Sequence, residues 1–143
     1  MRWADARLLE IGYQAFNLYA FAMLKKHLPD HAIWNSFALT KALKYVESTE
    51  FLRGIEENPF AYPYNPCGLE VAFAVQEFPT VYSNPIVLRS GWIRRQFEHN
   101  LDSETGLLVT NTSDPTVLAA RLYEATRLDD LDLTDIPLAK PLV

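Results

Sequence analysis

Two stretches of the sequence are apolar on nearly every side when they are projected as helices. The first runs from about residue 3 to about residue 27, and the second from residue 66 to about residue 78. A helix with this pattern either packs on all sides inside a protein or spans a membrane. Glu10, Gln14 and Asn17 interrupt the first stretch, which leaves no uninterrupted apolar run of membrane-spanning length. We therefore expect two buried helices and no membrane insertion.

Three further segments alternate apolar and polar positions with a helical period, which predicts half-exposed helices. The first covers about residues 32–48 and follows Asp30, a suitable N-cap. Its expected apolar stripe consists of Trp34, Phe37, Ala38, Ala42 and Tyr45. The second begins at Asn84-Pro85 and runs to about residue 97, and the third begins at Asp114-Pro115. A capping residue followed by proline is typical of a helix start, and Asn65-Pro66 gives the same signal for the helix over 66–78.

The segments between these helices are rich in turn-forming residues. We expect residues 49–65 to be irregular, residues 101–113 to hold a short hairpin around Gly106, and residues 128–143 to form an extended tail. The sequence thus predicts a single all-α domain over residues 1–143. Its helices are expected in antiparallel hairpins, with inner helices sandwiched between half-exposed outer ones.

Composition and charge exclude several classes of function. The chain has 143 residues, one cysteine and a formal net charge of −5, which gives no reason to expect nucleic-acid binding or a disulfide framework. The three histidines, His27, His31 and His99, lack a metal-ligand spacing, and no glycine-rich phosphate loop is present. We therefore expect no metal and no cofactor. The N-terminus does not resemble a secretory signal, which favours a cytoplasmic location.

The loop before the second apolar helix carries the first candidate binding residues. Aromatic rings stack on the apolar faces of sugars, and amide groups bind hydroxyls, so Tyr62, Tyr64 and Asn65 predict a saccharide subsite. Trp34 is a further aromatic candidate. The alternative is that the tyrosines pin the loop to the core and that Asn65 only caps the helix.

Glu70 is the candidate catalytic residue, because it is the one charge in the run Leu69-Glu70-Val71-Ala72-Phe73-Ala74. On an inner helix its carboxyl group is either desolvated, with a raised pKa as a general acid requires, or paired with an arginine. The alternative is a paired or partly solvated carboxylate in the first turn of the helix, favoured by the helix dipole. The sequence supplies no second carboxylate of the kind that a glycosidase needs.

Two runs carry a resemblance to a known superfamily. They are Ala61-Tyr62-Pro63-Tyr64-Asn65-Pro66-Cys67-Gly68-Leu69-Glu70, which leads into an inner helix, and Asp114-Pro115-Thr116-Val117-Leu118-Ala119-Ala120-Arg121-Leu122-Tyr123-Glu124-Ala125, which opens a later one. With the hairpin expected around Pro29, they resemble the (α/α) toroid, or six-hairpin, superfamily of sugar-active proteins. It includes N-acylglucosamine 2-epimerase-like isomerases, glycoside hydrolases and polysaccharide lyases. Such toroids have more helices than the five predicted here, so the resemblance implies a partial toroid, completed by self-association or by a further part of the protein.

Two functions from different classes follow. The first is a carbohydrate-active domain of the sugar isomerase, epimerase or glycoside-cleaving type, with a saccharide as its ligand. The second is a non-catalytic helical module that binds a partner or a ligand. The first requires Tyr62, Tyr64, Trp34 and Glu70 to converge on one open site.

Overall fold

The regular structure of residues 3–131, the part that this computed structural model describes, is helical apart from one isolated β-bridge, and side chains are described from residue 6 onward. The all-α prediction is confirmed. The α-helices are α1 (Trp3–His27), α2 (Phe37–Lys44), α3 (Thr49–Glu56), α4 (Cys67–Glu77), α5 (Pro85–Asn100) and α6 (Pro115–Ala120). Four 3-10 helices join or extend them: η1 (Ala32–Asn35), η2 (Tyr45–Glu47), η3 (Pro79–Val81) and η4 (Arg121–Arg127).

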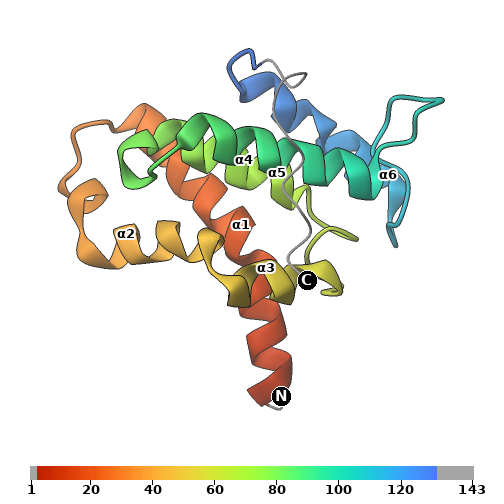
Figure 1. Cartoon of the computed structure of the whole chain (residues 1–143), viewed down its shortest axis with the longest axis horizontal. Coiled ribbons are helices and arrows are strands. Elements are labelled where there is room, and N and C mark those ends of the chain that lie inside the picture. The colour runs from red at the N-terminus through yellow and green to blue at the C-terminus, as the bar shows by residue number, and fades with distance from the viewer. Residues whose placement is uncertain (1–2, 132–143) are drawn as a thin grey trace.

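Helix α4 is the centre of the fold, as its apolar sequence predicts. Every residue from Cys67 to Val75 is buried, because α1 packs on one side of the helix and α5 on another (Figure 1). The short connection through η3 makes α4 and α5 an antiparallel hairpin. Gly68 permits their close approach, since a Cβ atom at this position would lie 2.3 Å from the carbonyl oxygen of Trp92.

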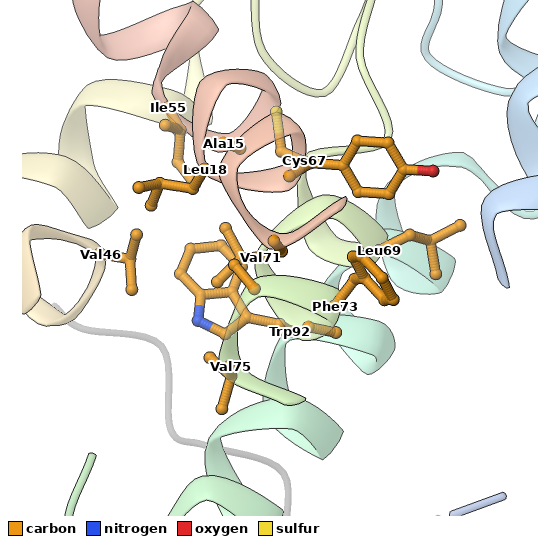
Figure 2. Close-up of a cluster of buried hydrophobic side chains, with 14 of the residues drawn as sticks. Ala15, Leu18, Val46, Ile55, Cys67, Leu69, Val71, Phe73, Val75 and Trp92 are labelled. Atoms are coloured by element: carbon orange, nitrogen blue, oxygen red, sulfur yellow. The ribbon is translucent and has the colours of Figure 1, made fainter. Parts of the chain in front are cut away.

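The hydrophobic core forms around α4, with side chains from α1, α5 and η2. Figure 2 shows the indole of Trp92 beside Val71 and Val75, with Val46 of η2 at its edge and Leu18 of α1 nearby. Each of these side chains is at most 2% exposed. Burial of a large apolar side chain stabilises a fold by roughly 1.5–3 kcal/mol, so this cluster holds α1, α4 and α5 together and fixes the position of the first turn of α4.

Helix α1 has the predicted bounds, but only one of its sides is buried. Ala15, Leu18 and Ala22 face the core, whereas Leu8, Phe16 and Leu24 are more than 40% exposed. The partial toroid, and whatever covers these exposed apolar side chains, stay predictions. Within the described residues, no helix combines the length and the apolar character that a membrane span requires.

The predicted helix over 32–48 is wrong in its continuity and in its buried face. The chain turns at Ser36, whose hydroxyl accepts a hydrogen bond from the backbone N–H of Leu39 at 3.3 Å and caps α2. A serine oxygen competes for backbone donors in this way and favours helix starts. Leu39 and Leu43 are consequently buried, while Phe37, a member of the predicted stripe, is 84% exposed. Asp30 is not the cap either, because His31 takes that role for η1.

The predicted irregular segment 49–65 is also partly wrong, since its first half forms α3. The hydroxyl of Ser48 caps this helix by accepting from the N–H of Phe51 at 3.1 Å. Other start signals are confirmed: Asn84 caps α5 and Asp114 caps α6. The turn at Gly106 is confirmed by its positive φ of 69° and the bridge between Leu101 and Leu108. Of the predicted tail, residues 132–143 lie outside the described residues.

Candidate functional site

A buried charged cluster joins the start of α4 to the C-terminal segment of the described chain. The guanidinium of Arg121 donates from Nη2 to Oε1 of Glu70 and from Nε, at 2.8 Å, to Oε1 of Glu124. Glu70 lies in the first turn of α4, and the other two residues are three positions apart on η4, where a 3-10 helix brings i and i+3 into line. The side chains of Glu70 and Glu124 are 0% and 2% exposed, and that of Arg121 is 17% exposed. We call these residues the Glu70–Arg121–Glu124 cluster.

Asn65 completes the coordination of the guanidinium. Its Oδ1 accepts from Nη1 of Arg121 at 2.5 Å, and its Nδ2 donates to the carbonyl oxygen of Phe60 at 2.6 Å. Helix α4 begins after Pro66 with no side-chain cap, so the prediction that Asn65 caps it is wrong. All three nitrogens of Arg121 are thus engaged, and its planar fork sets the orientation of both carboxyl groups.

The electrostatics of the cluster favour a proton on Glu70 near neutral pH. Burial raises the pKa of Glu70 to about 7, although Arg121 opposes the rise, and burial also raises the pKa of Glu124. Burial alone would lower the pKa of Arg121, but the two carboxylates raise it, so the guanidinium stays charged. Two carboxyl groups on one cation form a coupled pair in which the first proton binds readily. A raised pKa and an arginine partner were expected as alternatives for Glu70, but the residue combines an arginine partner with burial that raises its pKa.

Four buried polar atoms around the cluster have no hydrogen-bond partner in the described part of the chain. They are Oε2 of Glu70, Oε2 of Glu124, the hydroxyl of Tyr19 and Nη1 of Arg127. The guanidinium of Arg127 lies 5.9 Å from the ring centroid of Tyr19. Burial is the main cause that raises the pKa of Tyr19 to about 12, and the negative charge of Glu124 adds to the rise. Buried polar groups are nearly always hydrogen-bonded, so these four atoms make the cluster a candidate for binding a ligand or water.

Of the predicted site residues, Asn65 and Glu70 come together on Arg121, whereas Trp34 lies at the opposite end of α4. The ring of Tyr62 is 1% exposed and stacks on His99 at 4.1 Å, so one of its faces is occupied. Tyr64 is 40% exposed. Trp34 packs against Phe78, which follows the opposite end of α4. Trp34 therefore lies apart from Glu70, and the part of all three aromatic residues in saccharide binding stays a prediction.

Two exposed aromatic rings that the sequence analysis did not select border the cluster instead. Arg121 lies 5.5 Å from the ring centroid of Phe16, and Arg127 lies 4.9 Å from that of Tyr123. The available signal was the spacing Arg121-x-x-Glu124-x-x-Arg127, which also occurs on ordinary exposed helices. Among the described residues, no three histidine, cysteine, aspartate or glutamate side chains are grouped as a metal site would require.

Comparison with known proteins gives one relative. No family model matches the chain, and no solved structure matches it. Over 122 residues the chain is 42% identical to the archaeal glycosylation protein Q of Haloferax volcanii, an alignment that covers 85% of this chain and 32% of that protein. The chain thus spans about a third of the length of this relative, and it is similar to a protein whose name assigns it to glycosylation.

Proposed function

We propose that this chain belongs to a carbohydrate-active protein that takes part in glycosylation, and that the Glu70–Arg121–Glu124 cluster is its saccharide site. The observation that carries the proposal is the 42% identity to the archaeal glycosylation protein Q across most of the chain. The cluster supports it chemically, because buried carboxyl groups held by an arginine are strong acceptors for sugar hydroxyls.

The chemistry of the site favours proton transfer to or from a sugar. A carboxyl group whose pKa is about 7 exists in both its acid and its base form at neutral pH, as general acid–base catalysis requires. Glu124 is the second carboxyl group that sequence alone did not supply. A reaction of the sugar isomerase, epimerase or glycoside-cleaving type is the finer form of the proposal.

The same proposal includes a partial (α/α) toroid. The buried α4 between α1 and α5, together with the exposed apolar residues of α1, supports an inner layer of helices that needs further covering. A second copy or a further part of a longer protein would supply the remaining helices.

Two experiments test the role in glycosylation. The purified chain is applied to an array of immobilised saccharides, beside Glu70→Gln and, as a control at an exposed loop position, Glu104→Gln. We expect binding that Glu70→Gln weakens and Glu104→Gln leaves unchanged. Deletion of the gene in the organism that encodes the chain should remove or shorten glycans on its glycopeptides, as measured by mass spectrometry. Unchanged glycans together with no saccharide binding would overturn the proposal.

The second candidate function is a non-catalytic module that binds a partner or ligand. The near-complete burial of both glutamates favours it, because a reacting group must reach its substrate. Saccharide binding without any turnover of the bound sugars, followed by NMR over several hours, would select this alternative.

A further inference from the structure

We infer that the Glu70–Arg121–Glu124 cluster binds two neighbouring hydroxyl groups of an uncharged sugar through Oε2 of Glu70, Oε2 of Glu124, the hydroxyl of Tyr19 and Nη1 of Arg127. This inference rests on the proposed function and specifies its ligand. The inferred binding atoms come from α1, α4 and η4, and they differ from those of the aromatic loop at residues 60–65 that the sequence predicted.

The convergence of these four atoms is the first argument. Helix η4 packs along α4, which in turn packs along α1 (Figure 1). Arg121 of η4 pairs with Glu70 of α4, and Arg127 of η4 lies 5.9 Å from the ring centroid of Tyr19 of α1, so these side chains gather at the same elements. Tyr19 is 9% exposed, Glu70 is 0% exposed and Glu124 is 2% exposed. The four atoms are buried with no hydrogen-bond partner within residues 3–131. Each such atom destabilises a fold, and a ligand that supplies the missing hydrogen bonds recovers that free energy on binding.

The hydrogen-bonding character of the atoms identifies the chemical class of ligand. The two carboxylate oxygens accept hydrogen bonds, the nitrogen of Arg127 donates one, and the hydroxyl of Tyr19 does either. A phosphate or carboxylate group offers few or no donors to the glutamates, and an ammonium group offers no acceptor to Arg127. A hydroxyl group both donates and accepts, so a pair of adjacent hydroxyls satisfies the whole set.

Charge argues against a cationic ligand. The formal charges of Arg121 and Arg127 balance those of Glu70 and Glu124 when both carboxyl groups are ionised, and a proton on Glu70 leaves one positive charge. The exposed rings of Phe16 and Tyr123 lie against the two guanidinium groups. Aromatic faces at the border of a polar site suit the apolar face of a sugar ring.

The element that carries most of the site is suited to move when a ligand enters. Helix η4 is a 3-10 helix of seven residues, longer than the three or four residues that such helices usually reach, and its hydrogen bonds have poorer geometry than those of an α-helix. Gln76 holds its end: Nε2 donates to the carbonyl oxygen of Arg127 at 3.2 Å, and Oε1 accepts from the N–H of Asp129 at 2.8 Å. Entry of a ligand would require a small displacement of η4 from α4 that exposes the carboxyl oxygens and keeps the two hydrogen bonds of Gln76.

Isothermal titration calorimetry on the full chain tests the inference. The probes are the methyl glycosides of glucose, galactose and mannose, with glucose 6-phosphate as an anionic arm and glucosamine as a cationic arm. Tyr19→Phe removes one hydroxyl and nothing else, and Tyr13→Phe makes the same change six residues earlier on α1. We expect at least one methyl glycoside to bind, about tenfold more weakly to Tyr19→Phe and Glu124→Gln, and within twofold of the parent to Tyr13→Phe.

The outcomes separate the inference from the proposed function. If a methyl glycoside binds but Tyr19→Phe and Glu124→Gln bind it as well as the parent, the inference is overturned and the proposed function stands. Tight binding of only the phosphate or the amine overturns the assignment to an uncharged sugar. Binding of no sugar at all overturns the inference, and together with unchanged glycans after gene deletion it also overturns the proposed function. Circular dichroism checks each variant, and if Glu124→Gln does not fold, Tyr19→Phe decides, because losing an unpartnered hydroxyl removes no hydrogen bond from the fold.

Discussion

Replacing Arg121 by methionine tests whether this one guanidinium stabilises the buried carboxyl groups. The variant keeps most of the side-chain volume but removes the donors to Glu70, Glu124 and Asn65. Removing one partner of a buried ion pair typically costs about 3–5 kcal/mol, because the remaining charge is left without compensation. Since two carboxyl groups lose their cation here, we expect a loss in this range at pH 8.

The loss should shrink in acid, and the sign follows from the pKa of Glu70. Its folded value of about 7 lies above its ordinary value of 4.5, so the folded protein binds this proton more tightly than the unfolded chain does. The corresponding stability, about 3 kcal/mol, is fully present below pH 4.5 and is lost as the pH rises through 7. Without Arg121 the pKa of both glutamates rises further. Protonation of the carboxyl groups in acid therefore removes their uncompensated charge, and at pH 4.5 the loss should approach about 1–2 kcal/mol, the contribution of the lost hydrogen bonds.

Urea unfolding followed by circular dichroism at pH 4.5 and pH 8 measures both values. Arg53→Met is the matched control, because Arg53 is exposed on α3 and should change stability by less than about 0.5 kcal/mol. An Arg121→Met variant as stable as the parent at pH 8, or one equally destabilised at both pH values, would refute the reasoning.

Two further predictions concern the helices that position the site. Gly68→Ala should destabilise the protein by about 2 kcal/mol or more, because the new Cβ atom would lie 2.3 Å from the carbonyl oxygen of Trp92. Gly91→Ala is the control and should be neutral or slightly stabilising, because a Cβ atom there would meet no neighbouring atom within 4 Å, and thermal unfolding measures both variants. Asn84→Ala should cost about 1 kcal/mol by removing the cap on the N–H of Val87, and urea unfolding with no loss would contradict that role.

The parts of the fold that were predicted correctly have their signals close together in sequence. Helix α1 ends near Pro29, α5 starts at Asn84-Pro85, and the apolar run around Glu70 marks α4 as buried. The errors occurred at two serines that cap helices. Ser36 begins α2 within the segment that was predicted to be one continuous helix, and Ser48 begins α3 where a loop was predicted. A serine within an amphipathic pattern is compatible with either outcome, and packing decides between them.

The site was predictable only in part, because its contacts join distant segments. The isolation of Glu70 within an apolar run pointed to a buried carboxyl group with an arginine partner. Which arginine fills that role depends on tertiary structure, since Arg121 lies 51 residues away. Glu124 and Tyr19 carry no local mark, because a glutamate and a tyrosine on amphipathic helices are ordinary surface residues until packing buries them.

Asn65 and Asn84 show how a distant charge overrides a local rule. Both precede a proline at a helix start, and the same signal predicts a cap at each. Asn84 caps α5 through Oδ1, which accepts from the N–H of Val87 at 3.3 Å. At Asn65 the corresponding oxygen accepts from the guanidinium of Arg121 instead, because a hydrogen bond from a charged donor is about twice as strong as one from a backbone N–H. Helix α4 therefore lacks a side-chain cap, because Asn65 instead orients the arginine that binds both carboxyl groups. A local sequence rule is expected to fail in this way where a residue is selected for a functional site and not for the stability of its helix.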